Sequence, residues 1–285
     1  MSSAPPNTSS ATSASAWRWV ICLLLMQATI INYMDRMALN QMSKRIKQAF
    51  ELNDTQYGML ESAFSFAFAI GAISIGFIVD RVSVRWVYPL VVCGWSLAGL
   101  FTGFASSFWI LLGCRFMLGL FEAGNWPCGI RTTRAILSPH ERSFGNSLFQ
   151  SGTAMGAVIA PGVILLILQH AEAKGEPDPW RIPFQLIGGL GIVWVALWFL
   201  LVPSRMVHTL GSREKPIPQE GAVRISDVLR DARFWALMMM VIAINITWHG
   251  YRTWMPLYLQ NERGYTEQAM NEFSIAYYLV ADVGA

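Results

Sequence analysis

Four ionisable residues lie within or beside apolar stretches of the sequence: Asp35, Arg36, Arg115 and Glu122. A charge at the centre of a membrane helix costs about 2.5–3.5 kcal/mol, so such residues face protein or water and usually serve a function. A carboxylate can exchange a proton, and burial and nearby arginines set its affinity for that proton. An arginine whose carboxylate partner becomes protonated can bind an anion. These residue types therefore predict proton exchange coupled to anion binding.

Structural roles remain open for the same residues. Asp35 and Arg36 could instead reach the nearby membrane surface. Arg115 and Glu122 lie seven residues apart on one helix face, where they could simply join helices. At 1.5 Å per residue, Asp35 and Arg115 fall at about 8 Å and about 9 Å from the same expected surface, with Glu122 at about 20 Å. Two helices thus bring charge to similar depths, which favours a shared site.

Seven long apolar blocks must position these residues. Hydrophobic residues make up 54% of the 285 residues and charged residues 14%, against about 25% charged in an ordinary soluble domain. A helix needs about 20 apolar residues to cross a bilayer. We therefore expect an all-α, polytopic membrane protein with spans over Trp17–Met34, Tyr57–Val79, Val87–Ala105, Phe108–Ile130, Phe144–Gln169, Pro183–Val202 and Phe234–Leu259.

The order of these blocks predicts a two-bundle organisation. The last apolar run, Phe273–Ala285, is too short to cross a membrane, so we expect a truncated chain with further helices beyond it. The expected parts are a disordered cytoplasmic tail (1–16), a six-helix bundle (17–202), a cytoplasmic linker (203–233) and the start of a second six-helix bundle (234–285), containing its first helix and part of its second.

Loop charge predicts the orientation in the membrane. Cytoplasmic loops are enriched in Lys and Arg. With the N-terminus inside, twelve Lys and Arg residues fall on the cytoplasmic side and six on the outside. We therefore expect a cell-membrane protein with a cytoplasmic N-terminus.

Several further polar residues lie at membrane depth. Gln150 could face a cavity or bond to a neighbouring helix, and Gly152 and Gly156 predict close helix packing in the same span. Arg252, counted from Phe234, lies near the outer surface, where we expect its side chain to reach the interface. Spacing alone assigns no role to the remaining acids and indicates a packed role for the histidine: Glu61, Asp282 and His249.

Two sets of residues resemble a known family. Gly76, Asp80, Arg81 and Arg85 resemble the loop motif between the second and third spans of the major facilitator superfamily, with Ser83 where glycine is common. The stretch Asn32-Tyr33-x-Asp35-Arg36, and Arg115-xxx-Gly119-xx-Glu122-Ala123 with Pro127, are similar to the anion:cation symporter family. Within that family they most resemble proton-coupled carriers of sugar acids such as hexuronates and galactonate.

The resemblance implies twelve helices in two bundles that rock about a central site. It implies that Asp35 and Glu122 take up protons, and that Arg36 meets the substrate carboxylate while Arg115 pairs with the acids in the substrate site. Tyr33 and Gln150 would contact substrate hydroxyls. From their position at the inner end of the second span, Gly76, Asp80, Arg81 and Arg85 could latch one conformation or form an ordinary charged loop at the interface. Phe68 stands where sugar-acid carriers often have a tyrosine, which leaves room for a less hydroxylated anion.

The resulting hypothesis is proton-coupled symport of an organic monoanion, most simply a hexuronate or aldonate, by alternating access. The alternatives are a carrier of another carboxylate or of a neutral sugar, and a membrane sensor that binds ligand without moving it. The sequence contains no cluster typical of metal ligands, nucleophilic catalysis or phosphate binding, so no enzyme activity, cofactor or metal is expected. The partners expected are protons, the anion and lipid, with no nucleic acid, for a monomeric protein.

Overall fold

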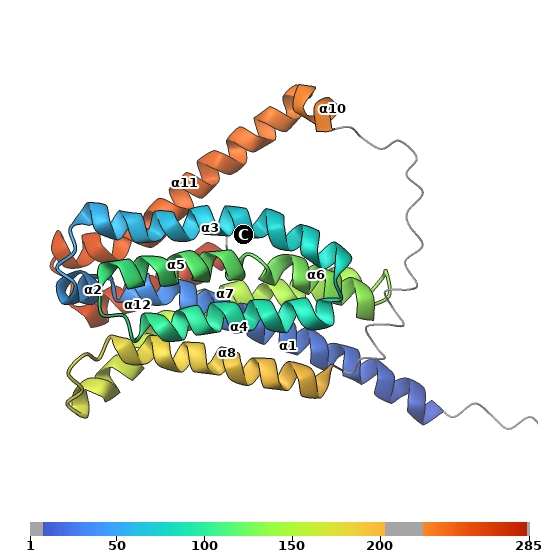
Figure 1. The fold of residues 1–285 in the computed structure, drawn as a ribbon, viewed down its shortest axis with the longest axis horizontal. Coiled ribbons are helices and arrows are strands. Elements are labelled where there is room, and N and C mark those ends of the chain that lie inside the picture. Colours follow the sequence, from blue (N-terminus) through green and yellow to red (C-terminus); the bar gives the residue numbers. More distant parts are fainter. Residues whose placement is uncertain (1–7, 203–224, 284–285) are drawn as a thin grey trace, which may run out of the picture.

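The computed structural model describes residues 8–202 and 225–283, and these residues form helices without strands. Two ends of the structure serve as landmarks: the α2 end, and the opposite linker end, at which α8 finishes and α10 begins (Figure 1). The helices are α1 (Thr8–Gln41), α2 (Ser43–Ala49), α3 (Asp54–Arg81), α4 (Val84–Thr102), α5 (Phe108–Glu122), α6 (Asn125–Ile136), α7 (Arg142–Ala173), α8 (Arg181–Leu201), α10 (Ile225–Arg230), α11 (Ala232–Asn261) and α12 (Glu267–Val283).

The predicted all-α membrane architecture is confirmed. Six of the described helices are long and apolar enough to cross a bilayer. They are α1, α3, α4, α7, α8 and α11, and each covers one of the expected spans. The structure therefore has the length and composition of a polytopic membrane protein.

The fourth expected span differs, because it is two helices instead of one. Ala123 and Gly124 form a turn between α5 and α6; their backbone angles stay near those of a helix, but they belong to neither helix. Pro127 has no backbone N–H and so cannot donate to the carbonyl of Ala123, four residues earlier. Proline is tolerated in the first turn of the next helix, α6. The prediction of one continuous helix over Phe108–Ile130 is therefore wrong, and the break directly follows Glu122.

The boundaries expected for the N-terminal tail and the linker also differ from the structure. Helix α1 begins at Thr8, so the expected disordered tail over 1–16 is corrected from Thr8 onward. Adding residues to an existing helix needs no new nucleus, and the alanines of this stretch favour it. Residues 203–224 of the expected linker lie outside the described residues, and the rest of it contains the short helix α10.

Close pairs of helices build the first bundle. Helix α1 packs on α7, α3 on α5, and α4 on α8. At the α1–α7 contact, a Cβ atom on Gly152 would lie 2.5 Å from the Met26 carbonyl oxygen, and one on Gly156 would lie 2.7 Å from the Cβ of Tyr33. Only glycine permits this approach, as expected for small residues four apart in a membrane helix.

Replacing Gly156 with leucine is expected to destabilise the bundle by about 1–3 kcal/mol, because the new side chain must push α1 and α7 apart. Thermal unfolding of the purified protein in detergent measures the loss. Gly189→Leu on α8 is the control, since nothing lies within 4 Å of a Cβ atom there. Equal melting temperatures for the two variants would contradict the close α1–α7 contact.

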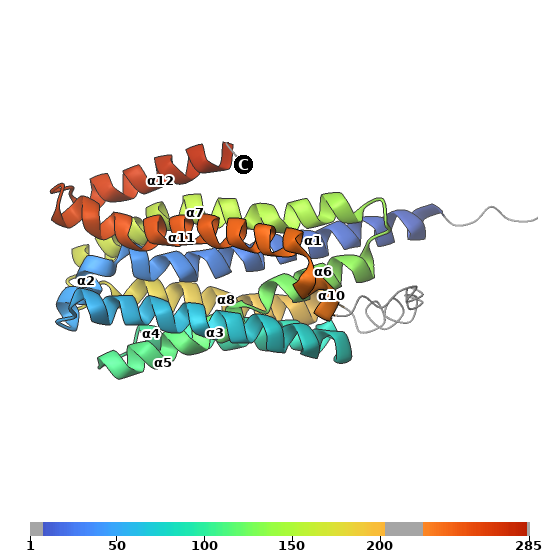
Figure 2. The same ribbon diagram turned by 90° about the horizontal axis from the view of Figure 1, so that it is seen from above.

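Helix α11 belongs to the second bundle and touches the first near one end. Its residues from Ala232 to Tyr251 are mostly exposed, whereas Arg252, Thr253 and most residues up to Gln260 are buried. Figure 1 shows α11 leaning away from the first bundle toward the linker end. Helix α12 returns from the α2 end and packs against α7 and α11 (Figure 2). The two bundles thus meet at the α2 end and diverge toward the linker end.

Candidate functional site

A cavity of about 760 Å³ lies in the first bundle between α1, α3, the α5–α6 break and α7. Both polar and aromatic side chains line it, so it can hold a ligand that carries hydroxyl groups and a charge. The lining residues are Thr29, Asn32, Tyr33, Arg36, Phe68, Ala72, Glu122, Ala123, Asn125, Trp126, Pro127, Gln150, Thr153 and Ala154. Four of the predicted site residues, Tyr33, Arg36, Glu122 and Gln150, are among them.

Arg36 and Glu122 form an ion pair in the wall of this cavity. The Nε and Nη2 atoms of Arg36 donate to Oε2 of Glu122 at 3.0 and 2.8 Å. The guanidinium also lies 5.1 Å from the Tyr33 ring centre and 5.0 Å from that of Phe68, within the range of cation–π attraction. Helix α1 therefore turns Arg36 inward, and the alternative in which it reaches the membrane surface is wrong.

Asp35 is buried against α4, about 100° around the axis of α1 from Arg36. It is 1% exposed, and neither carboxyl oxygen has a hydrogen-bond partner among the described residues. A Cβ atom added to Gly99 of α4 would lie 2.8 Å from its Oδ1 atom. Asp35 does not line the cavity, so the structure separates it from its sequence neighbour Arg36. It too fails to reach the membrane surface.

Arg115 lies outside the cavity and pairs with Glu61. The Nη2 atom of Arg115 donates to Oε1 of Glu61 at 2.7 Å, and Arg115 is 1% exposed. The expectation that Arg115 belongs to the substrate site together with Asp35 and Glu122 therefore needs correction. Its partner comes from α3, because side chains from neighbouring helices at equal depth meet more readily than residues seven apart on one helix.

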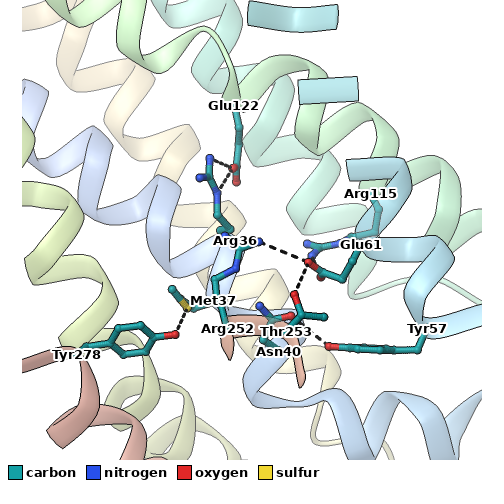
Figure 3. Close-up of polar contacts among 10 residues, drawn as sticks. All are labelled: Arg36, Met37, Asn40, Tyr57, Glu61, Arg115, Glu122, Arg252, Thr253 and Tyr278. Atoms are coloured by element: carbon teal, nitrogen blue, oxygen red, sulfur yellow. Dashed lines mark hydrogen bonds and ion pairs between the residues drawn. The ribbon is translucent and has the colours of Figure 1, made fainter. Parts of the chain in front are cut away.

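Arg252 joins the same cluster from the second bundle. It is 4% exposed, and its Nη2 atom lies 3.5 Å from Oε2 of Glu61. The neighbouring Thr253 donates its hydroxyl to that oxygen at 3.4 Å. The expectation that Arg252 reaches the membrane surface is wrong, because α11 inclines over the first bundle and buries this turn. Figure 3 shows Glu61 between Arg115 and Arg252, apart from the Arg36–Glu122 pair.

Sequence reasoning assigned no role to Glu61 and placed Arg252 wrongly. Their one sequence signal is a charge within an apolar span, the same signal that singled out Arg36 and Glu122. His249, expected to be packed, is half-buried beside the cluster, and its Nδ1 atom has no partner among the described residues. The side chain of Asp282 lies outside the described part of the structure.

The residues of the predicted conformational latch lie together at the linker end. Asp80 and Arg81 are exposed at the end of α3, and Arg81 donates to the Phe77 carbonyl oxygen at 3.2 Å. Arg85 donates to the Val202 carbonyl oxygen at the end of α8. Nothing lies within 4 Å of a Cβ atom on Gly76, so no close helix approach occurs there. Among the four latch residues, and within the described part of the chain, only Arg85 joins two separate helices of the first bundle in this conformation.

Sequence comparison identifies the family. A model of the Major Facilitator Superfamily matches residues 25–284, which is most of the chain. The chain belongs to the Major Facilitator Superfamily. Within this superfamily it is 27% identical over 286 aligned residues to the D-galactonate transporter of Escherichia coli O6:H1, covering 94% of this chain and 65% of that protein. It is 22% identical over 280 residues to the hexuronate transporter of Escherichia coli K12, covering 94% and 63%.

A solved structure supports the same superfamily fold. The chain aligns with a TM-score of 0.80 and 22% identity to a bacterial homologue of the human lysosomal transporter Spinster, described as inward-facing and occupied. The alignment covers 94% of this chain and 60% of that one. The chain therefore spans about two thirds of the length of these superfamily members, and their sugar-acid carriers confirm the resemblance found in the sequence.

Proposed function

We propose that this protein is a secondary transporter that carries an organic monoanion of the sugar-acid class together with a proton, by alternating access in the cell membrane. The observation that supports it most is the Arg36–Glu122 ion pair in the wall of a cavity large enough for a hexose-sized acid. The similarity to a D-galactonate and a hexuronate transporter supports the substrate class.

Charge balance at this pair links the anion to the proton. The empty pair is neutral, because the charge of Arg36 cancels that of Glu122. An anion alone would leave an excess negative charge in a poorly solvated site, and a proton on Glu122 alone would leave Arg36 unpaired. Anion and proton together restore neutrality, with the substrate carboxylate on Arg36. The two therefore bind favourably only as a pair, which is the condition for symport.

Asp35 supplies a second site for a proton. A carboxylate that is buried without hydrogen bonds is costly, and most of this cost is removed when the group is protonated. Because neither oxygen of Asp35 has a partner in the described structure, we propose that Asp35 carries a proton in this conformation. Movement of α1 against α4 would bring it to water and release that proton.

One side of the remaining cavity wall can bind the hydroxyl groups of a polyhydroxylated ligand. Gln150 and Tyr33 offer an amide and a phenol to substrate hydroxyls, while Trp126, 52% exposed, offers an aromatic face. Phe68 adds a surface that cannot form hydrogen bonds, at the position where a tyrosine would bind a hydroxyl group. This observation favours a second candidate, a carrier of a less hydroxylated carboxylate.

Uptake into proteoliposomes tests the proposal and separates the candidates. The complete protein would be given labelled galactonate, glucuronate, and short aliphatic carboxylates, with and without an inward proton gradient. We expect saturable uptake of a sugar acid that the gradient drives above equilibrium. Uptake of the aliphatic acids alone would favour the second candidate. Saturable uptake that ignores the gradient would refute proton symport.

A further inference from the structure

We propose that Glu61 is the outer gate of this transporter: its carboxylate ties α3 of the first bundle to α11 of the second, and the outer side opens only when that tie breaks. The inference rests on the alternating access proposed above and adds a residue and a contact to it. With the expected topology, the α2 end faces outward, and Glu61 lies at that end.

The two oxygens of Glu61 serve different bundles. Oε1 accepts from Arg115, at 2.7 Å, inside the first bundle. Oε2 accepts from Thr253 at 3.4 Å and lies 3.5 Å from Arg252 Nη2, and both residues belong to α11 (Figure 3). Rotation of one bundle against the other would break only the contacts of Glu61 with Thr253 and Arg252. Arg115 would meanwhile hold Glu61 in place, ready to close again.

Glu61 lies between the cavity and the outer surface. It is the eighth residue of α3, counted from the α2 end, and the cavity residue Phe68 lies seven residues further along the same helix. At 1.5 Å per residue, Glu61 is about 10 Å nearer the outer surface than the cavity wall. A contact between bundles at this depth blocks the way from outside to the cavity.

Burial shields this contact from solvent more than it shields the ionic bridge between Arg45 and Glu267 at the same end. The side chains of Glu61 and Arg252 are 10% and 3% exposed. The second bridge, in which Arg45 of α2 donates to Glu267 of α12 at 2.8 Å, joins side chains that are 27% and 22% exposed. Solvent screens the more exposed pair more strongly, so the Glu61 contact depends less on salt. Toward the linker end, α11 is mostly exposed. The described contacts of α11 with the first bundle therefore lie at the α2 end and close only that side of the cavity.

Removing the charge of Glu61 should open the gate, because one carboxylate here balances two arginines. With Glu61→Gln, Arg115 and Arg252 would face each other at short range without a counter-charge, and like charges in a buried site repel strongly. The closed arrangement loses stability while the outward-open one, in which water reaches Arg252, loses little. The equilibrium between the two states must then shift outward.

Thiol labelling tests the shift without substrate or proton gradient. The native cysteines Cys22, Cys93, Cys114 and Cys128 would be replaced, and Ala154→Cys would report on the cavity that it lines. A membrane-impermeant maleimide would be applied to right-side-out and to inside-out vesicles. We expect Glu61→Gln to raise labelling from the outside by about tenfold and to lower labelling from the inside.

Asp54→Asn is the matched control. Asp54 lies on the same helix at the same end, but its ion pair with Lys47 stays within the first bundle, so labelling should not change from either side. Unchanged labelling in Glu61→Gln would overturn the gate, and so would a rise from both sides, which indicates loosened folding. Since no transport is measured, a failure of the proposed symport would leave this result interpretable.

Discussion

Replacing Arg36 with alanine is expected to weaken binding of the transported anion by about 30-fold or more. The guanidinium is the cavity's own cation, and truncating one partner of a buried, hydrogen-bonded charge pair costs about 2–5 kcal/mol. The loss of affinity should be the same for substrates that share a carboxylate and differ in their hydroxyl groups, because Arg36 would contact only the carboxylate. Isothermal titration of the purified protein, or the half-saturating concentration in counterflow exchange, measures it.

Arg36→Lys is the matched variant for this test. Lysine keeps the charge and loses the planar fork that holds Oε2 of Glu122 through two nitrogens. Its affinity should fall between those of the original protein and Arg36→Ala. If alanine binds the anion as well as arginine does, Arg36 serves only to neutralise Glu122, and the substrate carboxylate must bind elsewhere.

Replacing Glu122 with glutamine is expected to abolish proton-driven accumulation and to leave counterflow exchange measurable. Glutamine resembles the protonated acid in shape and charge, so Arg36 stays available to the anion while the proton site is lost. Asp35→Asn should act in the same direction, because it fixes the neutral form of a buried carboxyl. Accumulation against a concentration gradient and exchange at equilibrium would be measured on the same vesicles.

Glu51→Gln is the control for both carboxyl variants, since Glu51 is exposed at the α2 end, away from the cavity. It should accumulate substrate as the unmodified protein does. Accumulation that persists in both Glu122→Gln and Asp35→Asn would show that neither carboxyl couples the proton. Loss of exchange along with accumulation would instead mean that Glu122 is needed to hold the anion.

The arrangement of spans was predictable because it depends on one simple quantity, the length of apolar sequence between charges. That quantity predicted α1, α3, α4, α7, α8 and α11 within a few residues at the apolar ends. It failed for the fourth span, where a continuous apolar run hides the backbone effect of Pro127. It also failed before Trp17, because polarity says little about whether a helix extends into water.

The sequence predicted those features of the site that depend on one helix alone, and missed those that depend on contacts between helices. Charge at membrane depth singled out Arg36 and Glu122, which the structure brings together. Depth counted along α11 assumed a helix upright in the membrane, and its inclination buries Arg252 instead of exposing it. Partners across helices, such as Glu61 with Arg115 and Arg252, depend on rotation and tilt that no spacing within one segment records. For the same reason Asp35, next to Arg36 in sequence, faces a different helix.

The interruption after Glu122 has a mechanical consequence. Glu122 is the final residue of α5, and Pro127 offers no N–H to the carbonyl of Ala123, so one helical hydrogen bond is missing just after Glu122. The N–H of Gly124 bonds to the carbonyl of Phe121, three residues back instead of four. The missing bond makes bending between α5 and α6 easier than bending within a continuous helix. In the proposed transport cycle, bending here would let the carboxylate of Glu122 move away from Arg36 without rotation of either bundle.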